Sequence, residues 1–376
     1  MYKRTIQLKE LLEKKSHFLF GPRSTGKSTL IQQQLKESVV FDLLNRDTYR
    51  RLLADPGIIA KVPEGKVIVI DEIQKLPLLL DEVHRLIQQH NKRFLLTGSS
   101  ARKLKKGAAN LLAGRAWQAS LLPLTSREID DFDLLKYLNH GGLPHVYDSE
   151  YYVDELSEYL SLYLREEVAG EALTRNIEAF SEFLDLVGLS NGCEINYQSF
   201  SSDCGVSQNT IKNYFSILED TLIGYKLAAF TKTKRRKAIS RSKHFLFDVG
   251  VVNTIKKISN IQQDSSIFGD AFEHFIVNEI RAYNLYAKRR EQICYWRSVY
   301  KDEVDVVVDK KIAIEIKSTK RVQNKHLKGL KVFKEEGLVE KYVIVTQDPI
   351  RQIDSSGISM IPWHEFLSEL WNGDFF

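Results

Sequence analysis

The segment Gly21-Pro-Arg-Ser-Thr-Gly26-Lys27-Ser28 decides most of what this chain can be. Its spacing fits the pattern G-x-x-x-x-G-K-[ST] at every fixed position, which is typical of a loop that binds nucleotide phosphates. The largely apolar His17–Phe20 precede it as a strand would, and Thr29–Lys36 leave it with helical character. Because the pattern requires this strand-loop-helix context, we expect an α/β fold built around a phosphate-binding loop.

Glycines in such a loop let backbone N–H groups approach the phosphates, and the helix N-terminus adds a favourable dipole. We expect Lys27 to reach the β- and γ-phosphates, and the Ser28 hydroxyl to bind Mg²⁺. The predicted cofactors are therefore ATP and Mg²⁺. The predicted nucleotide-binding residues are Gly21, Pro22, Arg23, Ser24, Thr25, Gly26, Lys27, Ser28 and Thr29.

A second apolar segment, Lys66–Ile70, ends in two acids, Asp71 and Glu72. Such uninterrupted apolar runs suit a parallel strand that is buried on both faces. Ligands of open α/β sheets bind at the carboxyl ends of the strands. We therefore expect Asp71 to hold Mg²⁺ and Glu72 to polarise the attacking water, with simple loop positions as the alternative.

A third apolar strand, beginning at Arg93, ends at Thr97 and Ser99. These small polar groups are expected to orient water or the γ-phosphate, or to cap the next helix, which we place at Ala101–Leu112. Arg115 then precedes another predicted strand, Trp117–Leu124.

This order of nucleotide loop, acidic strand end, polar strand end, helix and arginine resembles the AAA+ ATPases. The resemblance implies that Arg115 is an arginine finger, which in that family reaches the ATP site of a neighbouring subunit. A guanidinium there would stabilise the charge that develops on the γ-phosphoryl oxygens. A homo-oligomer with ATP sites at its subunit interfaces is implied as well. The alternative is a surface arginine at a turn.

Composition sets broad limits on the class of protein. With 376 residues, 43% of them hydrophobic and 27% charged, the chain is expected to form two or three globular domains. A net charge of +5 does not by itself establish nucleic-acid binding. Cys193, Cys204 and Cys294 lack the spacing of a zinc site and suit a reducing compartment. No apolar run approaches the length of a membrane span, so a cytoplasmic protein is expected.

The middle of the chain carries a helix–turn–helix pattern. Ser199–Asp220 is expected to form a helix, a turn at Gly205 and a second helix whose N-terminus Ser207 caps. The second helix has an apolar stripe made of Ile211, Tyr214, Phe215 and Leu218. With the stripe facing inward, the polar side chains near the start of the helix are left exposed, namely Gln208, Asn209, Lys212 and Asn213. These are the types of side chain that contact bases or phosphates.

Two predicted strands, Leu222–Phe230 and His244–Phe247, flank a basic run and close a hairpin. With the preceding helices this is the pattern of a winged helix with a cationic wing tip, for which phosphate contact is electrostatically favoured. The alternatives are a protein-binding winged helix and a merely solvated basic tip. The predicted DNA-contacting residues of the tip are Lys234, Arg235, Arg236 and Lys237.

Glu303–Val308 and Ile312–Lys317 read as two strands around a turn at Asp309. Period two places Glu315 and Lys317 on one face of the second strand, and Asp305 can point to the same side. Such a convergence can form a divalent-metal site with a general base or charge stabiliser. A helix at Gly269–Ala282 would add Glu273.

This arrangement is similar to the D…E-x-K motif of restriction-endonuclease-like folds. In those nucleases the two acids bind Mg²⁺ and the lysine activates or positions water. The resemblance therefore implies metal binding by Asp305 and Glu315 and a catalytic role for Lys317. A buried ion-pair network that does not cut DNA stays open as the alternative.

Residues 1–350 as a whole resemble a family of prokaryotic AAA+ ATPases whose C-terminal half, of unknown function, combines a winged helix with a restriction-endonuclease-like fold. The expected domains are an ATPase domain at 1–135, a helical lid or linker at 136–180, a winged helix at 181–256, a nuclease-like α/β domain at 262–350 and an amphipathic tail at 351–376. The segments that carry the resemblance are Gly21–Thr29, Val69–Gln74, Leu96–Ala101, Leu112–Ala116, Pro123–Glu128, Gly141–Pro144, Val206–Asp220, Phe247–Gly250, Gly269–Glu273, Trp296-Arg297, Glu303–Asp305 and Glu315–Lys317.

Three functions are compatible with these patterns. The first is an oligomeric, Mg²⁺- and ATP-dependent ATPase that binds duplex or branched DNA and that cuts or only grips it. The second is a nucleotide-gated switch or scaffold with a catalytically silent nuclease-like domain. The third is a transcriptional regulator that uses the winged helix.

Overall fold

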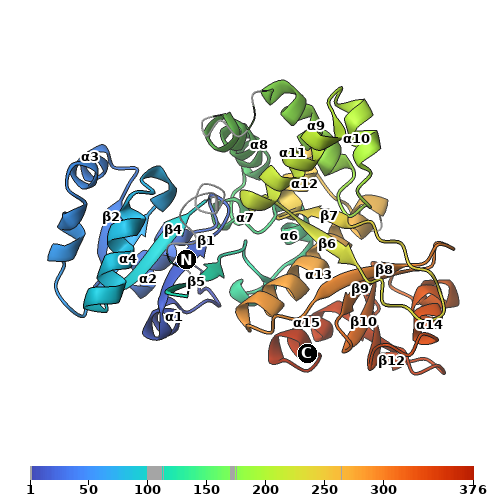
Figure 1. Ribbon diagram of the computed structural model, residues 1–376. Helices are drawn as coiled ribbons and strands as arrows, with labels where there is room; N and C mark the ends of the chain where they lie inside the picture. Colours follow the sequence, from blue (N-terminus) through green and yellow to red (C-terminus); the bar gives the residue numbers. More distant parts are fainter. Residues whose placement is uncertain (1, 100–111, 113, 170–173, 175, 264) are drawn as a thin grey trace. The chain divides into compact units, whose positions relative to one another are not determined.

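The computed structural model describes residues 2–99, 112, 114–169, 174, 176–263 and 265–376, and Figure 1 shows its elements. The chain divides into two compact units. The first comprises Met1–Leu124, Leu143–His145 and Ser216–Ile223, and the second comprises Thr125–Gly142, Val146–Phe215 and Gly224–Phe376. Of the helix predicted at Ala101–Leu112, only Leu112 lies within the described residues.

The first unit alternates strands and helices, as the sequence predicts. Its strands are β1 (Ser16–Phe20), β2 (Val39–Asp42), β3 (Val67–Asp71), β4 (Arg93–Gly98) and β5 (Ala116–Ser120). Its helices are α1 (Leu8–Lys14), α2 (Lys27–Gln34), α3 (Arg46–Ala54) and α4 (Leu79–His90), with short 3₁₀ turns at Pro56–Lys61 and Ile73–Lys75. Strand β5 ends earlier than the predicted Trp117–Leu124.

All neighbouring strands of this unit run parallel, in the order β2-β3-β4-β1-β5. Helix α1 packs on β1 and β4, and α4 packs on β4. The side chains of Ile68, Val69 and Ile70 in β3 are fully buried, as expected for a parallel strand covered on both faces. Because β4 lies between β1 and β3, its polar end stands between the phosphate-binding loop and the acidic pair.

The second unit begins with helices and ends in a mixed α/β region. Its helices are α6 (Leu134–His140), α7 (Pro144–Tyr147), α8 (Tyr152–Leu162), α9 (Ile177–Leu189), α10 (Tyr197–Asp203), α11 (Gln208–Asp220), α12 (Val249–Ile255), α13 (Ser266–Tyr286), α14 (Lys328–Lys334) and α15 (Trp363–Asn372). Both α7 and α11 straddle the division between the units. A π-helical segment, Tyr163–Ala169, and 3₁₀ turns at Ser126–Glu128 and Asn324–Leu327 complete the helical elements. Its strands are β6 (Gly224–Ala229), β7 (Lys243–Leu246), β8 (Ile293–Arg297), β9 (Glu303–Val308), β10 (Ile312–Lys317), β11 (Lys341–Thr346), β12 (Gln352–Ile353) and β13 (Ser359–Pro362).

The predicted helix–turn–helix is present as α10 and α11. Gly205 has φ of 63°, a left-handed conformation that glycine adopts without strain, and it forms the turn. The hydroxyl of Ser207 accepts a hydrogen bond from the backbone N–H of Thr210 at 3.1 Å, which confirms the predicted cap. The predicted apolar stripe is buried, with Tyr214 only 1% exposed.

The hairpin that follows α11 belongs to a larger sheet than a winged helix requires. Strand β6 pairs with β7 and also, in parallel, with β8 through Ala228 and Cys294. One sheet of eight strands results, in the order β12-β13-β11-β10-β9-β8-β6-β7. Helices α13 and α14 pack against β10, and α15 packs against β11 and β13.

Two glycine-containing segments that the resemblance singled out meet in this unit. The Asp248 carboxylate accepts hydrogen bonds from the backbone N–H groups of Gly142 at 2.7 Å and Val251 at 3.1 Å. Gly141 has φ of 78°, and a Cβ built on it would stand 2.1 Å from Asp248 Oδ1. Asp248 therefore ties the turn to the N-terminus of α12, and this close contact leaves room only for glycine at position 141.

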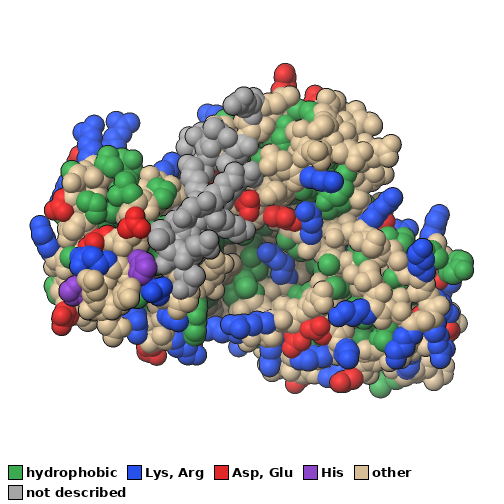
Figure 2. All heavy atoms as spheres, viewed as in Figure 1, with side chains coloured by type: hydrophobic (Ala, Val, Ile, Leu, Met, Phe, Trp, Pro, Cys, Tyr) green, Lys and Arg blue, Asp and Glu red, His purple; other side chains and the backbone are tan. Residues whose placement is uncertain are grey.

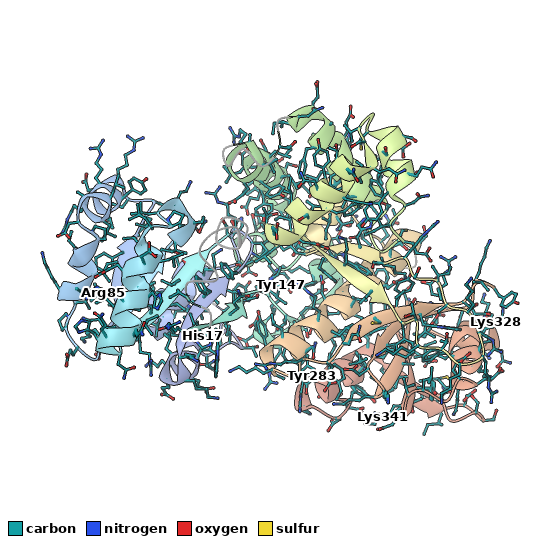
Figure 3. All side chains as sticks on the ribbon, viewed as in Figure 1. His17, Arg85, Tyr147, Tyr283, Lys328 and Lys341 are labelled. Atoms are coloured by element: carbon teal, nitrogen blue, oxygen red, sulfur yellow. The ribbon has the colours of Figure 1, made fainter. Side chains whose placement is uncertain are left out.

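The C-terminal tail packs on its own unit. In α15 the side chains of Phe366, Leu367 and Leu370 are buried. Tyr283 of α13 donates a hydrogen bond to the carbonyl of Phe376, and Lys341 donates to the carbonyl of Asp374. Figure 3 labels the two donors. Among the described helices, none is both long enough and apolar enough to cross a membrane.

Candidate functional site

The phosphate-binding loop follows β1 and opens directly into α2. Ser24 and Gly26 have φ of 63° and 87°, so the backbone turns sharply at both positions. Gly21 lies so close to β5 that a Cβ there would stand 2.5 Å from the Leu121 carbonyl oxygen. The loop is thus a tight backbone cradle at a helix N-terminus, which suits phosphate groups and confirms the predicted strand-loop-helix arrangement.

Two cationic side chains hold this cradle. The ammonium group of Lys27, which is 8% exposed, donates to the carbonyl oxygens of Gly21 at 2.7 Å and Pro22 at 3.0 Å. The buried guanidinium of Arg4 donates to the carbonyl oxygens of Thr25 at 2.7 Å and Leu122 at 2.5 Å. No motif pointed to Arg4, because it lies 21 residues before Thr25 in an unremarkable N-terminal segment.

The Ser28 hydroxyl and the acidic end of β3 are adjacent. Ser28 Oγ donates to Asp71 Oδ2 at 3.2 Å. The Thr97 hydroxyl at the end of β4 donates to the other carboxylate oxygen, Oδ1, and accepts the backbone N–H of Glu72 at 3.2 Å. A hydroxyl and a carboxylate are the oxygen donors that Mg²⁺ prefers, so Ser28 and Asp71 fit the predicted metal-binding pair.

Glu72 is held by a neighbour that sequence reasoning missed. Its backbone has φ of 58°, and its carboxylate accepts a hydrogen bond from Gln74 Nε2. The same amide nitrogen donates to Ser99 Oγ at 3.2 Å. Gln74, which is 2% exposed, therefore links the predicted water-polarising acid to the polar end of β4.

Arg115 immediately precedes β5 and is half-buried. Within the described ranges it forms no ion pair. Arg165, in the π-helical segment, pairs instead with Glu158 at 3.1 Å on the exposed surface. The role of Arg115 as an arginine finger at the ATP site of a neighbouring subunit stays a prediction, because the structure contains one chain.

The predicted DNA-contacting residues of α11 are exposed at the start of that helix. Gln208, Asn209 and Lys212 are exposed, and the Lys212 ammonium lies 5.7 Å from the centroid of the Tyr197 ring. On the face shown in Figure 2, cationic and acidic side chains are interspersed over the C-terminal unit.

The basic segment between β6 and β7 does not project as the predicted wing tip. The buried carboxylate of Glu336 accepts hydrogen bonds from the backbone N–H groups of Lys234, Arg235 and Arg236 at 2.8, 2.8 and 3.0 Å. Arg236 also pairs with Glu335 at 2.5 Å. The segment is docked on its own unit, and Arg236 is already engaged. The side chains of Lys234, Arg235 and Lys237 are exposed.

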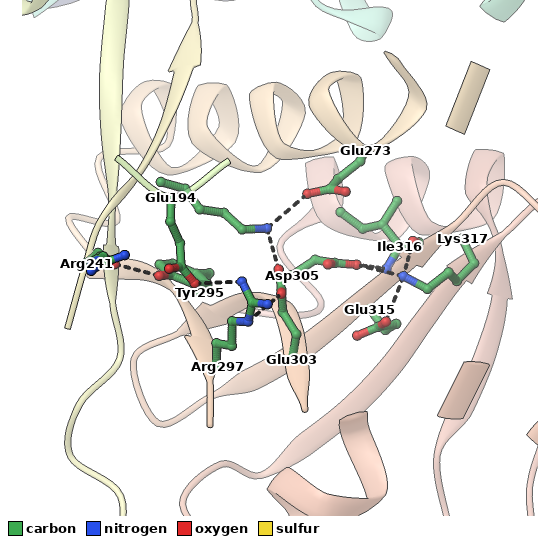
Figure 4. Close-up of polar contacts among 11 residues, drawn as sticks. Glu194, Arg241, Glu273, Tyr295, Arg297, Glu303, Asp305, Glu315, Ile316 and Lys317 are labelled. Atoms are coloured by element: carbon green, nitrogen blue, oxygen red, sulfur yellow. Dashed lines mark hydrogen bonds and ion pairs between the residues drawn. The ribbon is translucent and has the colours of Figure 1, made fainter. Parts of the chain in front are cut away.

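Asp305, Glu315 and Lys317 come together as the sequence predicted (Figure 4). Lys317 Nζ lies 2.7 Å from Glu315 Oε1 and 3.4 Å from Asp305 Oδ2. Asp305 Oδ2 also accepts the backbone N–H of Ile316 at 2.8 Å. The other oxygen of Glu315, Oε2, is buried and has no hydrogen-bond partner among the described residues.

A second layer of charge surrounds this triad. Lys243 of β7 lies 2.6 Å from Glu303 and 3.5 Å from Glu273 of α13. Arg297 pairs with Glu303 at 3.5 Å and with Glu194 at 2.8 Å. We call Glu273, Glu303, Asp305, Glu315, Lys243 and Lys317 the acidic cluster.

Burial and mutual repulsion raise the pKa values of two carboxyl groups in this cluster. Burial, reinforced by the Asp305 charge, raises the pKa of Glu273 to about 7 and the pKa of Glu315 well above its ordinary range. Burial alone would lower the pKa of Lys243, but the nearby carboxylates raise it, so this lysine stays charged. Within the described ranges, no three His, Cys, Asp or Glu side chains are already arranged to hold a metal ion.

Three family models match consecutive parts of the chain. Residues 13–130 match an AAA domain, residues 131–262 a domain of unknown function (DUF8612), and residues 268–366 a domain of unknown function (DUF4143). The match over 13–130 and the geometry of the loop and acidic pair define a P-loop ATPase domain of the AAA+ type. The chain therefore contains an ATPase domain over these residues.

Relatives and solved structures add little about the rest of the chain. An uncharacterized protein of Methanocaldococcus jannaschii is 25% identical over an alignment of 281 residues, and the match covers 65% of this chain and 63% of that protein. One of Haemophilus influenzae is 25% identical over an alignment of 268 residues, and the match covers 61% of this chain and 66% of that protein. The chain thus matches less than two thirds of the length of either relative.

The Aeropyrum pernix ORC1 protein in complex with DNA has a TM-score of 0.30 at 13% identity, covering 66% of this chain and 90% of that one. Can2 from Sulfobacillus thermosulfidooxidans in complex with cyclic tetra-adenylate has a TM-score of 0.18 at 10% identity, covering 95% and 98%. These TM-scores are too low to support a conclusion about function.

Proposed function

We propose that this protein is an oligomeric, Mg²⁺- and ATP-dependent ATPase of the cytoplasm that binds and processes DNA. The DNA-directed part of the proposal rests on one observation above all, the exposed polar residues at the start of α11. Gln208, Asn209 and Lys212 stand there above a buried apolar stripe, as they would on a helix that enters a groove of DNA.

In the ATPase module, the loop backbone and Lys27 would bind the β- and γ-phosphates. Ser28 and Asp71 would hold Mg²⁺, which neutralises phosphate charge when bound. Glu72, oriented by Gln74, would accept the proton of the attacking water. Thr97 would keep Asp71 and the backbone of Glu72 in place through its two hydrogen bonds.

Arg115 would complete the ATP site of a neighbouring subunit. The support is its place directly before β5, the strand that pairs with β1 beside the loop. A guanidinium supplied by a neighbour stabilises the charge that develops on the transferred phosphoryl group. ATP hydrolysis would therefore depend on assembly.

In the C-terminal unit, Asp305 and Glu315 would hold one divalent ion, and Lys317 would position water or stabilise charge. The support is the buried Glu315 Oε2, which no residue in the described part of the chain hydrogen-bonds and which lies in a cluster with excess negative charge. A divalent cation is the ligand that such a carboxylate oxygen suits. This assignment implies Mg²⁺-dependent cleavage of DNA.

A second candidate is a nucleotide-gated switch or scaffold whose acidic cluster is catalytically silent. The observation that favours it is the internal pairing of the cluster, in which Lys243 and Lys317 already contact carboxylates. Buried ion pairs of this kind can persist without catalysis.

DNA binding by variants of α11 tests the first candidate. Lys212→Ala should weaken duplex binding and reduce its salt dependence by about one counterion, measured by fluorescence anisotropy over a salt series. Lys14→Ala, which removes an exposed lysine from α1, serves as the matched control and should leave both unchanged. Equal binding by all three proteins would favour the switch or scaffold.

A further inference from the structure

Lys243 is the most unusual residue of the acidic cluster. It is the first residue of β7, on the hairpin that follows the helix–turn–helix, and only 5% of its surface is exposed. Its ammonium group lies 2.6 Å from Glu303 Oε1 and 3.5 Å from Glu273 Oε1. It also lies 5.2 Å from the centroid of the Tyr295 ring. No part of the D…E-x-K pattern includes this lysine.

The two ends of the cluster differ in how their carboxylates are satisfied. Glu273 and Glu303 share the ammonium group of Lys243, and Glu303 also contacts Arg297. Glu315, which is 7% exposed, gives one oxygen to Lys317, and its other oxygen, Oε2, is buried without a hydrogen-bond partner in the ranges that the structure describes. Each end of the cluster therefore holds one lysine ammonium group. What distinguishes the Glu315 end is a buried carboxylate oxygen that no described residue satisfies.

Charge counting agrees with this division. Glu273, Glu303, Asp305 and Glu315 carry four negative charges when ionised, and Lys243 and Lys317 supply two positive ones. The Arg297–Glu194 ion pair is neutral and leaves the balance unchanged. Two negative charges remain, which one divalent ion would neutralise, whereas two such ions would leave an excess of positive charge.

We infer that Lys243 is a built-in cation of the acidic cluster, so that the cluster binds one divalent ion, at Asp305 and Glu315, and excludes a second. The ammonium group occupies the position between Glu273 and Glu303 where a second ion of a two-metal site would need its ligands. Lys243 is thus a positioning residue that acts through these two glutamates. The inference rests on the proposed metal site of the C-terminal unit.

The number of Mn²⁺ ions bound per chain tests this directly. The titration uses full-length, nucleotide-free protein carrying Asp71→Asn, so that the ATP site does not contribute, and free Mn²⁺ is followed by its electron paramagnetic resonance signal. We expect one ion with Lys243 present, two with Lys243→Met, and one again with Lys243→Arg. Circular dichroism shows whether each variant is folded.

Glu273→Gln provides a second measurement if Lys243→Met does not fold. Because Lys243 and not the metal engages Glu273, the Mn²⁺ affinity should change by less than roughly tenfold, the lower bound for loss of a supporting contact. Asp305→Asn, by contrast, should abolish Mn²⁺ binding.

Three results would overturn the inference. Two ions bound with Lys243 intact, or one ion with unchanged affinity in folded Lys243→Met, would contradict it while leaving the metal site itself standing. No Mn²⁺ bound by any variant would remove the proposed metal site, and the inference with it.

Discussion

The guanidinium of Arg4 donates a hydrogen bond of 2.7 Å to the carbonyl oxygen of Thr25, inside the phosphate-binding loop. Through a second hydrogen bond, to the Leu122 carbonyl, it joins that loop to the segment that follows β5. Arg4 is 5% exposed, so its side chain is part of the core beneath the loop. A residue near the start of the chain thus sets the shape of the nucleotide site.

Replacing Arg4 should weaken nucleotide binding. In Arg4→Ala the buried carbonyls of Thr25 and Leu122 lose their donors, which costs about 1–3 kcal/mol for each buried group left unsatisfied. We expect a lower melting temperature and roughly tenfold weaker ATP affinity, since 1.4 kcal/mol corresponds to a factor of ten. Calorimetric titration with a non-hydrolysable ATP analogue measures this. Partial recovery in Arg4→Lys is expected, and wild-type affinity in folded Arg4→Ala would contradict the role.

Thr97→Val should slow ATP turnover without weakening ATP binding. Valine keeps the shape of the side chain but loses the hydroxyl that holds Asp71 and the backbone of Glu72. A loss of about 10²-fold in kcat with little change in KM is expected for a group that orients the catalytic residues. Thr48→Val in α3 is the matched control. A rise in KM at unchanged kcat would assign Thr97 to substrate binding instead.

Arg115→Ala should lose turnover while retaining ATP binding. If Arg115 acts on a neighbouring subunit, mixing this variant with Lys27→Ala should restore part of the activity, because some interfaces then combine an intact loop with an intact arginine. Steady-state phosphate release over a series of mixing ratios is the measurement. Activity that never exceeds the sum of the two inactive proteins would count against a finger acting between subunits.

Glu279 should make the stability of the C-terminal unit depend on pH. This buried carboxylate of α13 accepts hydrogen bonds from Ser126 N at 2.7 Å, Ser126 Oγ at 2.9 Å and Trp371 Nε1 at 2.8 Å. Burial nevertheless raises its pKa to about 7 from an ordinary 4.5. The folded state therefore holds its proton more tightly than the unfolded state.

The sign of the effect follows from this difference. Glu279 makes its full contribution to the unfolding free energy below pH 4.5, and this contribution is lost as the pH rises through about 7. The loss amounts to about 3 kcal/mol of unfolding free energy. In denaturant titrations, Glu279→Gln should remove this dependence, so the wild type should lose stability relative to the variant between pH 4.5 and pH 8. A constant difference across that range would refute the assignment.

Local sequence patterns predicted those parts of the site whose residues lie close together in the sequence. The bounds of β9 and β10 match the predicted Glu303–Val308 and Ile312–Lys317, because the intervening turn and the apolar strands are encoded within fifteen residues. The loop, the acidic end of β3 and the cap at Ser207 were likewise predictable from short segments.

Residues that act over long sequence separations could not be found in this way. Arg4, Lys243 and Glu336 reach partners 21 to 118 residues away, and each is a common charged residue in an ordinary local context. The parallel pairing of Ala228 with Cys294, which merges the hairpin into the eight-stranded sheet, leaves no mark on either strand alone. The docking of the basic segment could not be predicted for the same reason, because Glu336, whose carboxylate holds the segment, is about 100 residues away in the sequence.

The most direct test of the central claim is Mg²⁺-dependent ATP turnover, titrated with single-stranded, duplex and four-way-junction DNA. The proposed function predicts that at least one DNA form stimulates turnover, and that Lys27→Ala abolishes both basal and stimulated activity. Robust turnover that is indifferent to every DNA form, with no DNA bound, would contradict a DNA-coupled ATPase and leave the nucleotide-gated switch or scaffold.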